Sequence, residues 1–190
     1  MSTETNPWAS VDESVFSPAG LTREDVRPDV DGLDYDGIEY SVSGLRIVGR
    51  FARITPTKNG AFVAVWRRAA DGGTRPFDVA DPFDAFTIAV REGTSFGLFV
   101  FSKAALVGHG LVSADRSGAV SDDGSGDGDG VRTRTRTRTS VGKRGFRLYA
   151  PWVAPSSRQA ERSQAQQAPH FLDLTAGPAS SADVSRLFAA

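Results

Sequence analysis

Residues 53–68 read RITPTKNGAFVAVWRR, and this stretch carries the strongest signal for the fold. Two runs rich in β-branched and aromatic residues, 51–54 and 61–66, flank a turn at 56–60. The Asn59-Gly60 pair inside that turn favours a hairpin, because both residue types tolerate positive φ. The stretch therefore predicts two antiparallel strands joined by a short turn.

Further strands are predicted on both sides of this hairpin. Ile38, Tyr40 and Val42 alternate with polar residues, a period of two that indicates one buried face. More strands are expected at 45–48, 86–90, 97–101 and 146–149, and helices at 103–106 and 156–167. We therefore predict an α+β fold, a single domain with a central, mostly antiparallel β-sheet flanked by helices.

Composition divides the chain into three parts. Residues 1–26 are polar with scattered apolar positions and are expected to form a flexible N-terminal arm, and residues 175–190 a C-terminal tail. The domain is assigned to 27–174. It is interrupted at about 113–140 by an insertion that passes from an acidic Gly-rich segment into four Arg-Thr pairs. So polar a segment buries little apolar surface, and we expect the insertion to be disordered.

The 190 residues contain 22 Lys and Arg, 23 Asp and Glu and no Cys. The absence of Cys excludes disulfides, thiolate zinc sites and a Cys nucleophile. No apolar run approaches the roughly 18 residues of a membrane span, and the N-terminus does not have the pattern of a secretory signal. We expect a cytoplasmic protein with no membrane partner.

Several classes of catalytic site lack their motifs. His109 and His170, the only histidines, are far apart in the sequence, so a zinc hydrolase is not predicted. There is no phosphate-binding loop of the G-x-x-x-x-G-K-[S/T] type and no G-x-S-x-G nucleophile elbow. Nucleotide hydrolysis at such a loop and lipase-type chemistry are therefore excluded.

A magnesium-dependent nuclease needs two carboxylates and a nearby Lys to hold the ion and position water. Asp78 and Asp84 precede the strand at 86–90 and are the candidate ligands, and Lys103 ends the next strand. Phe101 stands two positions before Lys103, where an acidic ligand is expected. We therefore expect no cleavage, and no cofactor unless the nuclease hypothesis holds, in which case the cofactor is Mg²⁺.

Basic and aromatic side chains cluster near the ends of the predicted strands. Such basic groups can meet a phosphate backbone, and exposed aromatic rings can stack on bases. The alternative is that the aromatic residues pack a sheet face and the cations are solvated at its rim. The candidate nucleic-acid-binding residues are Arg53, Lys58, Arg67, Lys103, Arg147, Gln164 and Gln167. The candidate stacking or pocket residues are Trp66, Tyr149 and Trp152.

Residues 53–68 resemble the hallmark hairpin of the MepB family, R/K-x-T-P-x-K-x-G-x-F-V-x-x-W-x-R. The next blocks of the family pattern correspond, in the same order, to PFD at 76–78, FVFSK at 99–103, RLYAPW at 147–152 and QAERSQAQQ at 159–167. This chain departs from the pattern at Ser102 and Ala150, where the family has proline, at Ser163, where it has Thr, and at Gln166, where an aromatic residue is common. The insertion has no counterpart in the pattern.

The resemblance implies a bacterial family associated with multidrug efflux gene clusters, and a fold similar to the PD-(D/E)xK nucleases and restriction endonucleases. It implies nucleic-acid binding more than cleavage, because Phe101 occupies the acidic position. Three hypotheses stay open: a DNA- or RNA-binding domain on a degenerate nuclease-like fold, a module that binds a small ligand or a protein, and an active Mg²⁺ nuclease. A cationic groove favours the first, a closed apolar cavity the second, and a cluster of carboxylates near Lys103 the third.

Overall fold

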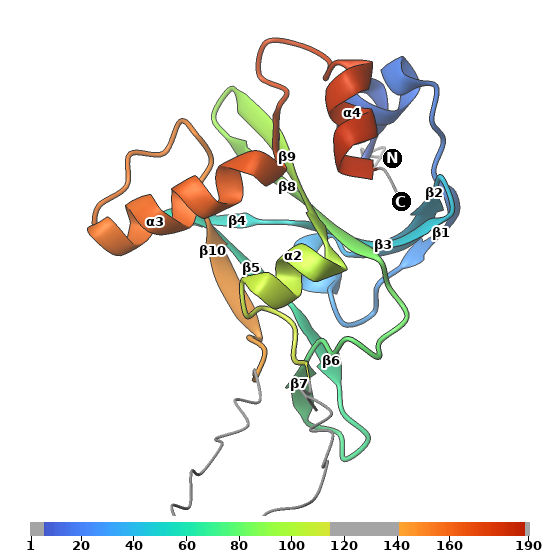
Figure 1. The fold of residues 1–190 in the computed structure, drawn as a ribbon, viewed down its shortest axis with the longest axis vertical. Helices are drawn as coiled ribbons and strands as arrows, with labels where there is room; N and C mark the ends of the chain where they lie inside the picture. The colour runs from blue at the N-terminus through green and yellow to red at the C-terminus, as the bar shows by residue number, and fades with distance from the viewer. Residues whose placement is uncertain (1–5, 115–140, 189–190) are drawn as a thin grey trace, which may run out of the picture.

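The computed structural model describes residues 6–114 and 141–188. Its centre is a six-stranded sheet in the order β1-β2-β3-β8-β9-β11 (Figure 1). Neighbouring strands are antiparallel, except β3 and β8, which are parallel. The strands span Glu24–Pro28 (β1), Ile38–Val42 (β2), Leu45–Phe51 (β3), Ala85–Glu92 (β8), Ser95–Ser102 (β9) and Phe171–Asp173 (β11). The predicted α+β domain with a central, mostly antiparallel sheet is confirmed.

A second, smaller sheet has the order β10-β5-β4, and β6 and β7 form a separate hairpin. These strands span Arg53–Thr55 (β4), Lys58–Ala64 (β5), Trp66–Arg68 (β6), Thr74–Pro76 (β7) and Gly145–Leu148 (β10). The helical segments are Ala9–Val11 (α1), Asp12–Phe16 (η1), Ser17–Ala19 (η2), Leu33–Tyr35 (η3), Lys103–Gly108 (α2), Arg158–Gln167 (α3), Ala168–His170 (η4) and Ser181–Phe188 (α4). None of these helices is long and apolar enough to cross a membrane.

The hairpin predicted at 53–68 is present as β4 and β5, but its turn is shorter than expected. Residues 56–57 alone join the two strands, and Asn59 and Gly60 lie within β5, where the pairing with β4 shifts. Gly60 has a φ of 80°, and a Cβ on it would lie 2.6 Å from the carbonyl oxygen of Leu148 on β10. The Asn-Gly pair therefore forms an irregularity that lets β10 approach closely, and the prediction that it makes the turn was wrong.

The two faces of the central sheet carry separate cores. The face toward the smaller sheet packs aromatic and branched residues of β8 and β9 against β5, β10 and α2. The buried residues at its centre are Val63, Phe77, Phe86, Ile88, Phe99, Phe101, Leu106 and Leu148. The opposite face is covered by the N-terminal helical turns and by α4, which lie together in Figure 1.

The N-terminal segment is part of this second core and does not form the flexible arm that its composition predicted. Its four buried apolar residues, each at most 2% exposed, are Trp8, Val11, Val15 and Phe16. Their spacing brings them to one side of a helical segment, so together they cover the sheet. The ring of Phe16 lies 5.4 Å from that of Phe188 on α4, so the predicted C-terminal tail is also packed, as far as residue 188. The predicted insertion lies, from residue 115 on, outside the described residues.

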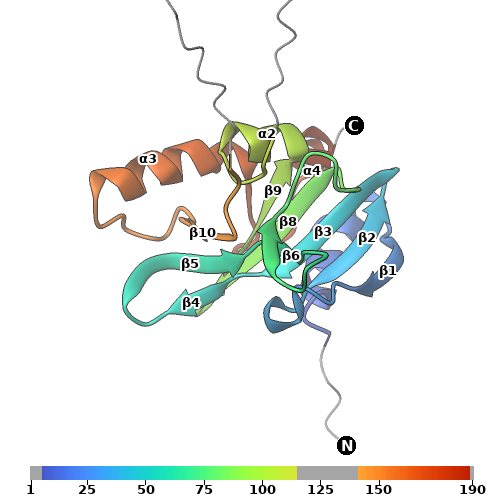
Figure 2. The same cartoon turned by 90° about the horizontal axis from the view of Figure 1, so that it is seen from below.

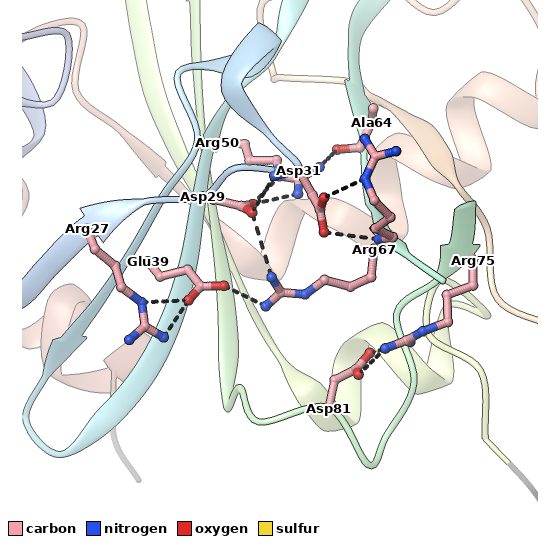
Figure 3. A network of polar contacts seen from close by, with 10 residues as sticks. Arg27, Asp29, Asp31, Glu39, Arg50, Ala64, Arg67, Arg75 and Asp81 are labelled. Atoms are coloured by element: carbon pink, nitrogen blue, oxygen red, sulfur yellow. Dashed lines mark hydrogen bonds and ion pairs between the residues drawn. The ribbon is translucent and has the colours of Figure 1, made fainter. Parts of the chain in front are cut away.

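A buried ion pair joins the two sheets. Arg50 on β3 and Asp29 after β1 are each 1% exposed, and Arg50 Nη2 lies 2.6 Å from Asp29 Oδ2 (Figure 3). Arg50 Nη1 donates to the carbonyl oxygen of Ala64, the last residue of β5, over 2.5 Å. Gly32 leaves room for the guanidinium, because a Cβ there would lie 2.7 Å from Arg50 Nε. One side chain therefore holds the end of β5 against the central sheet.

The buried pair leads to a first prediction, for Asp29→Ala. This substitution leaves the Arg50 guanidinium buried without its counter-charge, so we expect the free energy of unfolding to fall by about 3–5 kcal/mol. The measurement is urea denaturation. Arg46→Ala is the matched control, because it breaks an ion pair to Asp84 in which the arginine side chain is 55% exposed, and should cost at most about 1 kcal/mol. Equal, small losses in both variants would contradict the prediction.

Trp8→Ala tests whether the packing of the N-terminal segment contributes to the stability of the folded protein. A large ring removed from a buried site typically costs about 3–5 kcal/mol, and we expect a loss of that size here. Leu33→Ala, at a side chain that is 62% exposed, is the control and should change stability by less than about 0.5 kcal/mol. Thermal unfolding followed by circular dichroism would compare the two. If Trp8→Ala were as stable as the control, the result would contradict this prediction and support the flexible arm predicted from the sequence.

Candidate nucleic-acid interface

The outward face of the smaller sheet carries a row of two basic residues and one aromatic residue. Phe62 on β5 pairs with Arg53 on β4 and with Arg147 on β10 (strands in Figure 2). Residues directly opposite one another across strands share a face of the sheet. The adjacent residues Ala61 and Leu148 belong to the buried core, so the row points away from that core.

Tyr35, from η3, extends this row into what we call the cation–aromatic strip: Tyr35, Arg53, Phe62 and Arg147. The rings of Tyr35 and Phe62 lie 6.4 Å apart. The guanidinium carbon of Arg53 lies 5.6 Å from the centre of the Tyr35 ring, and that of Arg147 lies 5.9 Å from the centre of the Phe62 ring. Arg53 is exposed and the other three side chains are half-buried. Flat rings and guanidinium planes are therefore presented together on one face.

Neutral acceptors hold the two arginines of the strip in place. Arg147 Nη1 donates to the carbonyl oxygen of Gly60 over 3.0 Å, and its Nη2 donates to Thr55 Oγ1 over 3.0 Å. Arg53 Nε donates to the carbonyl oxygen of Asp34 over 2.6 Å. Carbonyls and a hydroxyl orient a guanidinium without cancelling its charge, so both arginines keep a full positive charge on this face.

Ion pairs neutralise a different set of arginines. Those within 4.0 Å of a carboxylate oxygen are Arg23, Arg27, Arg46, Arg50, Arg67, Arg68, Arg75 and Arg186. Lys58, at the start of β5, and Lys143 and Arg144, just before β10, join the strip arginines as cations that form no such pair in the described part of the chain. Three adjacent strands therefore carry an uncompensated positive charge.

Two basic residues predicted for the same groove lie elsewhere. Arg67, on β6, reaches toward Glu39 and Asp29 in Figure 3, with its Nη2 2.6 Å from Glu39 Oε1 and its Nη1 3.7 Å from Asp29 Oδ1. Lys103, at the start of α2, donates to the carbonyl oxygens of Val79 and Asp81 over 3.0 and 2.9 Å. Both side chains stabilise the fold, and neither belongs to the strip.

The pKa of Glu39 is consistent with its ion pair to Arg67. Burial raises the pKa of Glu39, but hydrogen bonds from Arg27 and Arg67 outweigh this effect and hold the pKa below 4.5. The carboxylate is therefore charged at neutral pH and shared between two guanidinium groups.

The two predicted glutamines bind backbone. Gln164 Nε2 donates to the carbonyl oxygens of Ala150 and Val153, each over 2.9 Å. Gln167 accepts from the Tyr149 amide and donates to the Arg147 carbonyl oxygen, each over 2.8 Å. These contacts fix α3 beside β10 and position the strand that carries Arg147.

The three predicted stacking residues do not form one platform: Tyr149 and Trp152 both lie near Phe171, and Trp66 is on a separate hairpin. Trp66 lies on β6, with Arg68 5.8 Å from its ring centre. Trp152 Nε1 donates to Glu92 over 3.0 Å, and Trp152 lines a pocket of about 520 Å³ beside the β4–β5 turn. Tyr149 lines a different pocket, under α3.

The carboxylates proposed as metal ligands are engaged with protein groups. Asp84 accepts from Arg46 Nε and Nη2 over 2.9 and 3.0 Å, and these hydrogen bonds lower its pKa to about 2. Asp78 accepts from Ser113 Oγ over 2.7 Å. Residues 6–114 and 141–188 contain no group of three or more His, Asp or Glu side chains placed to hold a metal ion.

Sequence reasoning missed Tyr35, Phe62, Lys143 and Arg144. The alternation within β5 could have revealed Phe62, because it stands between the inward-facing residues Ala61 and Val63. Nothing in the sequence indicates that Tyr35, on η3, would pack its ring beside that of Phe62. Lys143 and Arg144 adjoin the predicted insertion, and their position just before β10 was not predicted.

Comparisons with known proteins agree with this architecture. A family model described as MepB-like matches residues 29–120 and 132–173. Among solved structures, a crystal structure of MepB is similar, with a TM-score of 0.65 and 23% sequence identity over 80% of this chain and 86% of that one. At that level of identity the likeness shows a common fold. None of the curated proteins matches the chain.

The two histidines, distant in sequence, meet in the structure. The rings of His109 and His170 lie 5.6 Å apart, and both contact Phe101, with ring centres 6.0 and 5.0 Å away. Burial lowers the pKa of each below 6.5. Lys143 adds to the effect on His109, and His109 and Arg186 add to the effect on His170. The pair therefore favours the neutral form.

This pair predicts a pH dependence of stability. Because folding lowers both pKa values, the unfolded chain binds more protons than the folded chain at pH values near and below 6.5. The free energy of unfolding should therefore fall as pH decreases below 6.5. Urea midpoints above and below that pH would be compared between the parent protein and His109→Gln/His170→Gln. The double variant should lose less stability on acidification, and an unchanged pH dependence would contradict the prediction.

Proposed function

This chain belongs to the MepB-like family, and from that premise we propose that it binds nucleic acid at the outward face of its smaller sheet. We propose it as a binding protein on a degenerate nuclease-like fold, without a cleavage step. Such a role fits a cytoplasmic protein, the location predicted from the sequence.

The observation that supports this proposal most is the set of five cations on β4, β5 and the start of β10. Arg53, Lys58, Lys143, Arg144 and Arg147 form no ion pair within the described residues. The chain as a whole has a formal net charge of -1, so the positive charge of this face does not come from a general excess of basic residues. A phosphate backbone supplies the counter-charge that this face lacks.

The aromatic residues of the strip favour a single strand. Phe62 and Tyr35 present rings beside the guanidinium groups, and bases of a single strand can stack on such rings without regard to sequence. Arg53 and Arg147 lie on strands separated by one other strand, so their backbones are about 10 Å apart. A single strand crossing the three strands would meet both arginines and the ring between them.

Two other functions are weaker candidates. A module that binds a small ligand would use a closed apolar cavity, whereas the pocket of about 520 Å³ that Trp152 lines also contains Lys58, Asn59 and Glu92. A magnesium nuclease would have to recruit Asp78 or Asp84 away from Ser113 and Arg46.

The proposal is tested by fluorescence anisotropy with labelled single-stranded DNA of about 12 nucleotides over a salt series. Lys58→Ala and Lys143→Ala should each weaken binding, and each should reduce the slope of log K against log salt by about 0.7. Both are chosen because their ammonium groups make no hydrogen bond to the described part of the chain, so the fold does not depend on them.

Arg46→Ala is the matched control, because it removes one positive charge that Asp84 already neutralises, and it should leave affinity and slope unchanged. A second control replaces Arg132, Arg134, Arg136 and Arg138 with Ala, residues that lie outside the described part of the chain. Binding that disappears in this control but survives Lys58→Ala and Lys143→Ala would place the interface in the Arg-Thr run. No binding at low salt would overturn the proposal.

A further inference from the structure

A polar pocket of about 450 Å³ opens beside the interface, between β10 and α3. Leu111 and Phe146, 6% and 9% exposed, form an apolar side together with the buried ring of Phe101. His109 and Tyr149, both half-buried, contribute two further flat rings. The pocket is therefore large enough for a small aromatic ligand and has rings to contact one.

Helix α3 supplies the polar side of this pocket. Gln159, Ser163 and Gln166 line it, and their spacing of four and then three residues places them on one side of the helix. The side-chain amides of Gln164 and Gln167 hydrogen-bond to the backbone, as described above. In contrast, no hydrogen bond ties the side chains of Gln159, Ser163 and Gln166 to residues 6–114 or 141–188. These donors and acceptors are available to a ligand.

The charges around the pocket favour an anionic ligand. Its described lining contains Lys143 and Arg147 and no carboxylate. Arg147 also belongs to the cation–aromatic strip, so the pocket and the proposed interface meet at β10. Phe146 and Arg147 are successive residues of β10, so the pocket and the outward face lie on opposite sides of this edge strand, and a bound strand would reach the pocket around its edge.

We infer that this pocket receives one unstacked base of the bound single strand. The base lies among His109, Tyr149 and the apolar side, and its edge hydrogen-bonds to the amides of Gln159 and Gln166. Lys143 and Arg147 contact the flanking phosphates. In a duplex the base edges are already paired, so this contact selects single strands. The inference rests on the proposed function and adds a second contact that only an unpaired base can make.

The test compares two probes of equal length, a single-stranded oligothymidylate and the same sugar-phosphate strand without bases. The full-length parent protein should bind the base-bearing probe about tenfold more tightly, the typical effect of stacking one base. Ser163→Phe fills the pocket from α3 and should remove most of this preference. Ala165→Phe adds the same bulk to an exposed position outside the pocket, and should leave the preference intact.

Stacking on Phe62 would also favour the base-bearing probe, so the preference supports the pocket only if Ser163→Phe reduces it and Ala165→Phe does not. Gln159→Ala/Gln166→Ala is a second pocket variant that adds no volume, and it should also reduce the preference. Circular dichroism establishes that each variant is folded.

The failures of the two proposals are distinguishable. Equal binding of both probes by the parent protein would overturn the base pocket and leave the phosphate interface standing. A base preference that survives both pocket variants would also overturn it. Binding of neither probe would overturn the interface and the pocket together.

Discussion

The buried carboxylate of Asp29 is the contact on which the relative position of the two sheets depends. It holds Arg50 across the central sheet, and Arg50 in turn holds the carbonyl oxygen of Ala64 at the end of β5. Charges so deeply buried are tolerated only when they are paired and hydrogen-bonded, so an arrangement of β1, β3 and β5 that broke these contacts would be strongly destabilised. That arrangement sets the direction of β5, and through it the positions of β4 and β10. The position of the exposed basic face therefore depends in part on a buried ion pair that lies away from it.

Much of the fold could be predicted from two local signals. Period-two alternation identified β2 and β3, and runs of β-branched and aromatic residues identified the β4–β5 hairpin and β8 and β9, whose central residues are buried on both faces. The N-terminal segment was misread although its signal was present, since Trp8, Val11 and Val15 have helical spacing. Its polar neighbours and Pro7 suggested a loose arm, and only the packing against β2 and β3 shows otherwise. The Asn59-Gly60 pair was misplaced because positive φ suits a bulge as well as a turn.

The candidate site could be predicted only in part, for an electrostatic reason. A sequence shows which residues are basic, but not which carboxylate each will meet. Arg53 and Arg67 are both arginines of the stretch 53–68. In the structure Arg53 donates to a backbone carbonyl oxygen, whereas Arg67 lies within 4.0 Å of two carboxylates. The family-like blocks around Gln164 and Gln167 mark contacts that hold α3 in place. Motif positions therefore identified residues that support the candidate interface, and the register of β4, β5 and β10 identified the residues on its surface.

Gln167 has one more consequence. Strand β10 has a single strand neighbour, β5, and its other edge would expose backbone groups to any extended chain. The Gln167 amide bonds to the backbone of Arg147 and Tyr149 there, much as a neighbouring strand would. Open edges of this kind are where folded proteins begin to join sheet to sheet. A single side chain thus covers two backbone groups at the open edge of the strand that carries Arg147 and leaves fewer of them for pairing with another chain.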